Sequence, residues 1–256
     1  MNVVALHPGV VVARSVFWQT TCTIIHDGDE TFIVDSPVFP DELDALPAIL
    51  QQAEWNLSGL LATHGDWDHV LARTVFPDAS LGVAETTAAR LRGEPGAAQR
   101  ELRKEDEYHY VQRKPLKLGE VQALPVPGKL EIGEQELELH PATGHTPDGM
   151  TIWAPFAGVL CPGDYISPVE IPMVEDSISN YLATLNVLEP LVQEAEWVVS
   201  GHGGPIKSDQ ALAILREDVT YLQALQSDPE SAKLPIARSD GQQKKIHAEN
   251  LARLGD

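Results

Sequence analysis

Four side chains that can ligate metal ions occur within six consecutive residues of this chain. They are His64, Asp66, Asp68 and His69, in the segment His64-Gly65-Asp66-Trp67-Asp68-His69. Imidazole nitrogens and carboxylate oxygens are common ligands of divalent cations, and in a loop after a strand they can converge on two ions roughly 3.5–4 Å apart. Any one of these residues alone would be an ordinary turn or cap residue. Four together predict a metal site.

Three more apolar segments end in a His or an Asp beside a glycine. Residues 137–139 lead to Gly144-His145, residues 159–161 to Gly163-Asp164, and residues 197–199 to Gly201-His202. Residues 59–63 precede the HGDWDH segment in the same way. A short apolar run that ends abruptly in polar residues is typical of a buried strand that delivers a functional loop at its end. His145, Asp164 and His202 are therefore further candidate ligands.

The ordered series THGDWDH, GHTPDG, GD and GHG resembles the motifs of the metallo-β-lactamase superfamily of hydrolases, including its glyoxalase II and lactonase branches. The resemblance extends from about residue 35 to about residue 205. It implies an α/β (α+β) fold, a four-layer αββα sandwich with the site along one edge between two β-sheets. The mixed pattern of predicted strands and helices agrees with that fold.

The resemblance also assigns the ligands by position, because the family pattern HxHxDH falls on residues 64–69. The first metal would be held by His64, Asp66 and His145, the second by Asp68, His69 and His202, and Asp164 would bridge the two.

One position departs from the family pattern, because Asp66 stands where the second histidine is expected. A hard anionic oxygen in place of a nitrogen donor should favour manganese or iron at the first position, or weaken zinc there. We expect two divalent ions, with zinc as the first choice and manganese or iron as alternatives. An HxDxDH variant also resembles the nuclease domain linked to bacterial DNA-uptake channels, so the motif alone leaves phosphodiester substrates open.

The activity that the resemblance implies is hydrolysis of a small-molecule ester, thioester or lactone. Bound ions would lower the pKa of a water molecule toward neutrality, and the metal-bound hydroxide would attack a polarised carbonyl. Asp68 and Asp164 are the predicted catalytic residues, Asp68 because it could both ligate and orient the hydroxide. Two other classes stay open: an iron-dependent enzyme resembling sulfur dioxygenases, and a non-catalytic relative, which only Asp66 favours.

Four further residues are candidates for supporting roles. Asp35 matches a position where the family often has a carboxylate that orients a ligating histidine, although a turn before Ser36-Pro37 would also explain it. Trp67 and Tyr165 flank predicted ligands and could line a substrate pocket or pack beneath the loop. His247, on a predicted C-terminal helix, could reach the site edge or have a capping or surface role.

The elements that must position these residues follow from periodicity and turn signals. Residues 21–26 and 31–35 predict a β-hairpin around Asp27-Gly28-Asp29. Helices are predicted from about Ala45 to Ala53, and over residues 85–92, 97–111, 178–192, 209–225 and 243–254. The charged run at 100–107 is interpreted as a solvated face. We expect a single domain over residues 1–256, with residues 226–256 as a C-terminal helical cap.

The amino-acid composition indicates which classes of binding partner to expect. Eighteen basic and 38 acidic side chains give a formal charge of -20, which repels polyanions, so we expect neither nucleic acid nor an anionic membrane as a partner. The expected partner is a small-molecule substrate. Cys22 and Cys161 follow no CxxC spacing and are expected to be buried free thiols. Because no signal peptide or sustained apolar stretch is present, we expect a cytoplasmic protein.

Overall fold

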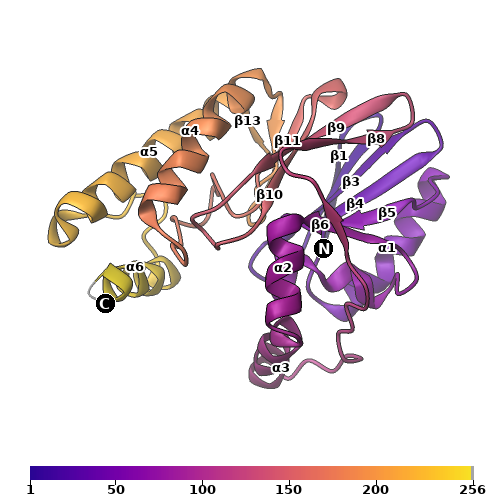
Figure 1. Cartoon of the computed structure of the whole chain (residues 1–256), viewed down its shortest axis with the longest axis horizontal. Helices are drawn as coiled ribbons and strands as arrows, with labels where there is room; N and C mark the ends of the chain where they lie inside the picture. The colour runs from indigo at the N-terminus through magenta and orange to yellow at the C-terminus, as the bar shows by residue number, and fades with distance from the viewer. Residues whose placement is uncertain (255–256) are drawn as a thin grey trace.

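The structure, a computed structural model, describes residues 1–254 as two β-sheets with helices on their outer sides (Figure 1). The first sheet has the strand order β1 (Asn2–His7), β2 (Val10–Arg14), β3 (Thr21–Asp27), β4 (Glu30–Asp35), β5 (Gly59–Leu61), β6 (Leu81–Ala84) and β7 (Gln122–Leu124). The second has the order β13 (Ile206–Lys207), β12 (Trp197–Val198), β11 (Val159–Cys161), β10 (Met150–Ala154), β9 (Gln135–Pro141) and β8 (Gly128–Ile132).

The helices occur where the sequence predicts them, with boundaries that differ by at most two residues except at the start of the first helix. They are α1 (Pro40–Ala53), α2 (Glu85–Gly93), α3 (Ala97–His109), α4 (Ile178–Glu194), α5 (Ser208–Ser227) and α6 (Gly241–Leu254). The predicted start of the first helix near Ala45 is wrong, because α1 begins at Pro40. Proline at a first helical position lacks only an N–H that would have no partner in the helix. The Phe39 N–H, just before it, donates to Glu42 Oε2 at 3.1 Å.

Alternating residues of the strands pack into different layers. In the first sheet, Ile24 and Ile33 pack with the residues of α1, α2 and α3, whereas Ile25 and Val34 pack against the second sheet. On the far side of the second sheet, the residues of α4 and α5 form a third apolar cluster. This alternation is the period of two that a buried strand requires. The predicted four-layer αββα sandwich is therefore confirmed.

The site lies at one edge because of strand direction. Strands β4, β5 and β6 are parallel neighbours, and β11 and β12 form a parallel pair in the second sheet. Parallel strands end at the same edge of their sheet, so the loops that follow them are brought together. The two sheets also meet there, since the Thr21 N–H donates to the Gly201 carbonyl at 2.8 Å.

The predicted hairpin is also present, as β3 and β4 pair in antiparallel register up to Asp27 and Glu30. Gly28, in the two-residue turn between them, has a φ of 58°, a conformation that glycine adopts at little cost. Cys22 and Cys161 are free and buried, as expected. Among residues 1–254, no helix has the length and apolar character needed to cross a membrane.

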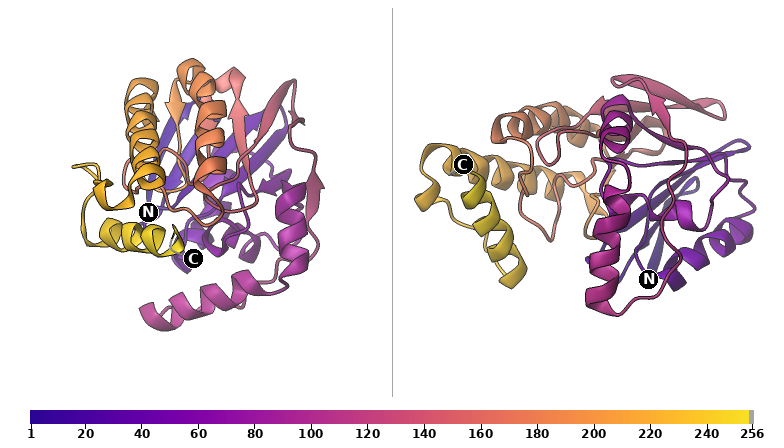
Figure 2. Two further views of the ribbon diagram at one scale, coloured as in Figure 1. Left: turned by 60° about the vertical axis from the view of Figure 1, so that its left-hand side comes forward. Right: turned by 60° about the horizontal axis from the view of Figure 1, so that its bottom comes forward.

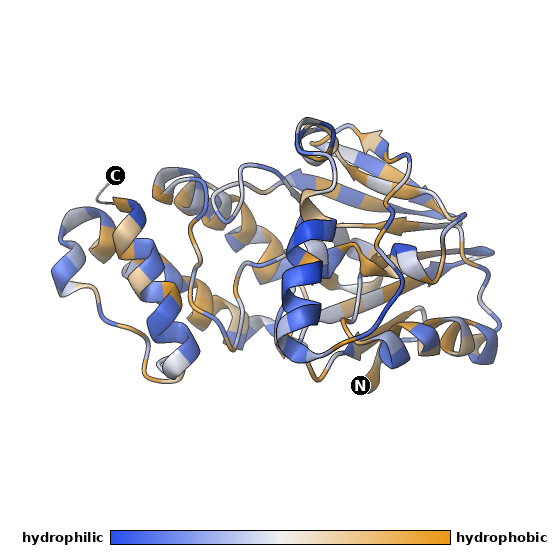
Figure 3. Ribbon diagram, turned by 90° about the horizontal axis from the view of Figure 1, so that it is seen from below, coloured by the Kyte–Doolittle hydropathy of each residue, from blue (hydrophilic) through white to orange (hydrophobic). Residues whose placement is uncertain are grey.

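The C-terminal helix α6 lies beside α4 and α5 and carries hydrophobic residues interspersed with hydrophilic ones (Figures 2 and 3). Its side chains hold the backbone of the long segment between β11 and α4. Gln243 Oε1 accepts from the Ile171 N–H at 2.8 Å, and Asn250 Oδ1 accepts from the Val174 N–H at 2.9 Å. Polar side chains of α6 thus accept backbone hydrogen bonds from this segment, as a neighbouring strand would do in a sheet.

Candidate metal centre

The structure brings all seven predicted ligands together at this edge of the sandwich. Three groups have ligand atoms within 4.8 Å of one another: His64 with Asp66 and His145, Asp68 with His69 and His202, and His64 with His69 and Asp164. The first two groups have the membership that the family resemblance implied for the two metals. The four segments that carry these residues follow β5, β9, β11 and β12.

Asp164 lies between the two groups. Its Oδ1 is 3.3 Å from His69 Nε2, and its Oδ2 is 3.3 Å from both His145 Nε2 and His202 Nε2. One carboxylate therefore faces histidines of both groups. This is the geometry that a carboxylate bridging two ions requires.

Each histidine of the cluster is held through its other ring nitrogen, Nδ1, by a hydrogen bond in His64, His145 and His202 and by an ion-pair contact in His69. The Nδ1 atoms lie 3.1 Å from Thr63 Oγ1 in His64, 3.0 Å from Asp35 Oδ2 in His69, 3.0 Å from the Met173 carbonyl in His145 and 3.1 Å from the Trp18 carbonyl in His202. Partners of this kind set the orientation of a ligating imidazole. All four Nε2 atoms are thereby directed into the space around Asp164.

The donor atoms in that space fit a metal. Buried atoms without a hydrogen-bond partner include Nε2 of His64, His69 and His145, and Oδ1 of Asp164. Buried polar atoms in folded proteins are almost always paired, so a cluster of unpaired ones requires an explanation. Divalent cations bound by these atoms would provide it, because imidazole and carboxylate are their usual donors.

The cluster is also strongly coupled in charge. Burial opposes ionisation of Asp164, but His202 and His69 outweigh it and hold the pKa of Asp164 well below its usual range. Burial likewise opposes protonation of His145, yet Asp164 raises the pKa of this imidazole from 6.5 to about 9. The carboxylate and the imidazoles thus favour each other's charged forms. Divalent ions would displace the protons of the imidazoles on binding.

Asp66, the departure from the family pattern, has a partner that the sequence analysis did not identify. Arg90, on α2, places Nη2 2.8 Å from Asp66 Oδ1 and Nη1 2.7 Å from Asp148 Oδ1. The other oxygen of Asp66, Oδ2, lies 3.5 Å from His64 Nε2 and 3.8 Å from His145 Nε2. Asp66 can therefore offer one oxygen to a metal while the other is bound by Arg90.

Asp148 completes this arrangement from the GHTPDG segment. It is buried, and its Oδ2 accepts from the Gly65 N–H at 3.0 Å. Asp148 thus connects the HGDWDH loop to Arg90. Because Asp148 lies in the GHTPDG segment, the sequence offered a reason to expect it at the site. Nothing in the sequence around Arg90 indicates that this residue contacts the site.

Asp35 contacts two parts of the site. One oxygen, Oδ1, accepts from the Thr63 N–H at 2.8 Å, and the other, Oδ2, accepts from Thr63 Oγ1 at 2.9 Å beside His69. The residue has a φ of 58°, which is uncommon for a side chain other than glycine or asparagine. Its position is that of a carboxylate orienting a histidine, one of the two roles considered for it.

The other three candidates lie at different depths. Trp67 is largely buried but lines the cleft above the ligands. Tyr165 is buried behind His145, where its hydroxyl accepts from the His145 N–H at 3.1 Å. His247 lies on α6 and pairs through Nδ1 with the Tyr221 hydroxyl at 2.9 Å. Of the three, only Trp67 borders the cleft.

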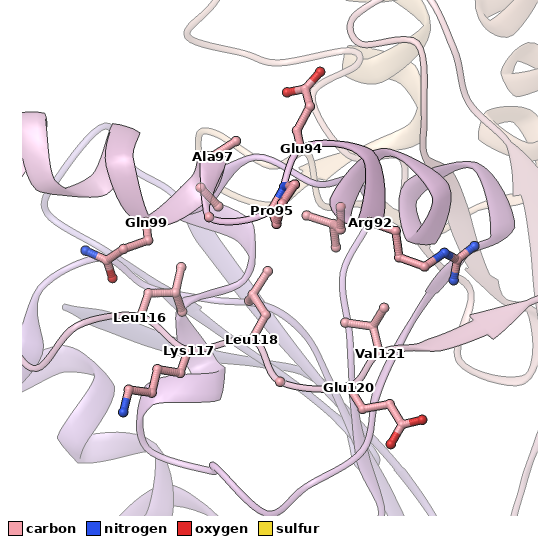
Figure 4. Close-up of a pocket in the computed structure, with 14 residues that line it drawn as sticks. Arg92, Glu94, Pro95, Ala97, Gln99, Leu116, Lys117, Leu118, Glu120 and Val121 are labelled. Atoms are coloured by element: carbon pink, nitrogen blue, oxygen red, sulfur yellow. The ribbon is translucent and has the colours of Figure 1, made fainter.

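The cluster forms the floor of a cleft of about 670 Å³, which we call the ligand cleft. Five of the predicted ligands line it: Asp66, Asp68, His145, Asp164 and His202. A second pocket of about 470 Å³ lies between the α2–α3 turn and residues 116–121 (Figure 4). It contains none of the ligands, and the segment from Leu91 to Ala98 contributes side chains to both hollows. The ligand cleft is therefore the candidate active site.

The fold and this cluster define a class of metal-binding αββα proteins. The family model described as the metallo-beta-lactamase superfamily matches residues 16–202. The chain therefore belongs to the metallo-beta-lactamase superfamily. Comparison of the sequence with curated proteins gives no significant match.

Solved structures show the same fold. A metallo-beta-lactamase family protein from Thermus thermophilus is 19% identical, with a TM-score of 0.71 over 98% of this chain and 95% of that one. A stereoselective inverting sec-alkylsulfatase from a Pseudomonas species is 14% identical, with a TM-score of 0.75 over 98% of this chain but 50% of the sulfatase. A beta-lactamase domain protein from Burkholderia ambifaria is 18% identical, with a TM-score of 0.68 over 99% and 87% of the two chains.

Proposed function

We propose that this protein is a metal-dependent hydrolase that cleaves a small-molecule ester, thioester or lactone. The observation that carries the proposal is the set of unpaired imidazole nitrogens around Asp164 at the floor of the ligand cleft. A superfamily whose fold is that of metallo-hydrolases supports it. We propose two divalent ions, with zinc as the first choice and manganese or iron as alternatives.

The proposed ligands divide between two positions. His64, Asp66 and His145 form the first position, Asp68, His69 and His202 form the second, and Asp164 is shared. Divalent ions held there would supply an activated water molecule near neutral pH and polarise the carbonyl oxygen of the substrate.

The chain's own residues would then direct the reaction. Asp68 lines the cleft, so its carboxylate would accept a hydrogen bond from the attacking water molecule and fix the direction of attack. Asp164 would hold the two positions at a constant separation. Asp35 would keep the ring of His69 from turning, because it fixes Nδ1.

A substrate panel tests the proposal directly. Apo-protein is reconstituted with zinc, manganese or iron, and each form is assayed on esters, thioesters, lactones and phosphodiesters, with metal content measured in parallel. We expect turnover on at least one carbonyl substrate and two ions per chain. The Asp68→Asn variant should lose that turnover, while Asp209→Asn, on α5 outside the cleft, should keep it.

Other outcomes identify the alternatives. Turnover on phosphodiesters alone would favour the nuclease-like class, and oxygen uptake by the iron form would favour the sulfur dioxygenase-like class. A chain that binds no metal would be a non-catalytic relative. Each of these results contradicts the proposed hydrolysis of an ester, thioester or lactone.

A further inference from the structure

The wall of the ligand cleft carries many carboxylates and almost no positive charge. In addition to the predicted ligands, six glutamates line it: Glu94, Glu101, Glu105, Glu170, Glu175 and Glu249. Arg90 is its one arginine, and no lysine lines it within residues 1–254. Both terminal nitrogens of Arg90 are already bound, to Asp66 at 2.8 Å and to Asp148 at 2.7 Å. The wall therefore offers no free cation to an anionic substrate.

Several of the glutamates come from two helices that line the cleft. Glu101 and Glu105 are one turn apart on α3, within the run that the sequence analysis interpreted as a solvated face. Glu249 shares one face of α6 with Gln242 and Ile246. The interpretation of residues 100–107 as a solvated face is therefore incomplete, because one face of α3 borders the cleft.

Three of these glutamates have an ion-pair partner: Glu101, Glu105, which lies 3.6 Å from His109, and Glu175, which lies 3.0 Å from Arg253. Burial raises the pKa of a fourth, Glu170, and so favours its neutral form. Glu101 pairs with Lys104 at 2.9 Å, but both side chains are more than half exposed, where an ion pair is strongly screened. Glu94 and Glu249 make no ion pair with any residue from 1 to 254. The candidate ions at the floor face three ligand carboxylates of their own. The wall thus determines the charge preference for the part of a substrate that lies away from the ions.

An aromatic face lies in the same wall. Trp18 is 39% exposed, and its ring centre is 5.6 Å from that of Trp67. Both tryptophans line the cleft, and the Trp18 carbonyl accepts from His202 Nδ1 at 3.1 Å. The backbone of Trp18 therefore lies next to the second metal position, and its partly exposed indole packs beside Trp67. The face of an indole attracts a cation, and most strongly an ammonium group with little hydration.

We propose that the ligand cleft selects esters or lactones that carry an ammonium charge on the part remote from the reacting carbonyl. Trp18, Glu94 between α2 and α3, and the glutamates of α3 and α6 line the part of the cleft that would receive that charge. The inference rests on the proposed function in taking the cleft as the place where a hydrolysable substrate binds. A cleft lined by one sign of charge concentrates ligands of the opposite sign and disfavours those of the same sign. Phosphodiesters and carboxylate-bearing esters are accordingly poor substrates.

Three matched esters test the proposal. They share one chromogenic leaving group, and their acyl chains end in trimethylammonium, in the isosteric neutral tert-butyl group, or in carboxylate. We expect kcat/KM to be about tenfold or more higher for the ammonium ester than for the carboxylate ester, with the neutral ester between them. The difference should shrink as salt rises from about 20 mM to about 500 mM, because salt screens exposed charges.

Variants of residues in the wall of the ligand cleft test whether these residues cause the preference for the ammonium ester. Glu94→Gln combined with Glu249→Gln should reduce the ratio between ammonium and carboxylate esters several-fold, and should change kcat/KM for the neutral ester less than for either charged ester. The control is Glu131→Gln with Glu134→Gln, which removes the same charge from exposed positions near the β8–β9 turn. Trp18→Leu should weaken the ammonium ester more than the neutral one. Equal effects of the two glutamate pairs would overturn the assignment.

A binding measurement separates this inference from the proposed function. Amides that cannot be cleaved, with the same three acyl ends, are titrated into the metal-loaded protein by calorimetry. If no ester is hydrolysed but the ammonium amide binds most tightly, the hydrolase proposal fails and the charge preference stands. If esters are hydrolysed and the carboxylate member is equal or better, the hydrolase stands and this inference is wrong.

Discussion

The two candidate metal positions differ in how deeply they are buried and in what supports their donors. At the second position, Asp68, His69 and His202 have side chains that are 8%, 0% and 5% exposed. At the first, the carboxylate of Asp66 is 25% exposed and is bound by Arg90, which is also 25% exposed. The second position thus has three buried donors, whereas one of the three donors at the first position, Asp66, is partly exposed and is bound by an arginine of α2.

This difference bears on metal binding. Burial opposes ionisation of Asp66, but the imidazole of His64 and the guanidinium of Arg90 outweigh it, so the pKa of Asp66 lies well below its usual range. The carboxylate is therefore charged, but it shares that charge with an arginine. We infer that the first position binds its ion less tightly and exchanges it more readily than the second. Variants of four residues around the two positions test that contrast.

Removing the shared ligand should have the largest effect, because it acts on both positions. Asp164→Ala should reduce activity by orders of magnitude and remove at least one ion, since a bridging carboxylate ligates both ions and offsets their repulsion. Turnover and elemental analysis on the same preparation measure this. Full metal content with unchanged turnover would show that Asp164 does not bridge.

Asp35→Ala should weaken the second position selectively. The ring of His69 would lose its fixed orientation, and loss of such a partner typically costs about 10–100-fold in metal affinity. Competition with a chelating dye, read as two successive dissociation constants, resolves the two positions. The Asp35→Asn variant, which keeps an acceptor for the Thr63 N–H, should lose less. An equal loss of metal affinity at both positions would contradict the proposed difference between them.

Arg90→Gln should weaken the first position by about tenfold and leave the second nearly unchanged. Without the guanidinium, Asp66 and the buried Asp148 lose the cation that they share, so Asp66 should no longer be held in its candidate ligating orientation. Arg92→Gln, on the same helix and exposed, is the matched control. Tighter metal binding at the first position in the Arg90 variant would mean that the positive charge of Arg90 opposes the ion more than its contact with Asp66 helps to orient that carboxylate.

Asp66→His should change the order of metals more than their total binding. Carboxylate oxygen suits manganese and iron, whereas imidazole suits zinc, so the wild type should work comparatively well with manganese or iron and the variant should shift toward zinc. Adding Arg90→Gln to this variant should help it, because the arginine would otherwise face an imidazole in place of a carboxylate. The same metal ranking and occupancy in all three proteins would refute the account of this position.

Much of the site could be predicted from the sequence because its ligands are presented locally. Each predicted ligand lies in a segment that directly follows a short apolar strand, and the types His and Asp at that place indicate metal binding without knowledge of distant segments. The helices were predicted for a similar reason, since their apolar spacing is a local pattern. The start of α1 was predicted too late because Pro47 was expected to interrupt any helix that began much earlier. The helix nevertheless begins at Pro40, directly after Phe39.

What supports these ligands was decided only by the tertiary structure. Arg90 reaches Asp66 across 24 positions of sequence, and it does so because α2 packs beside the HGDWDH loop. The acidic wall exists because α3 and α6, more than 130 residues apart, line the same cleft. Pairing of this kind depends on distances in space that no local pattern encodes. The candidate ligands could therefore be identified from the sequence, whereas their environment depends on how the layers pack.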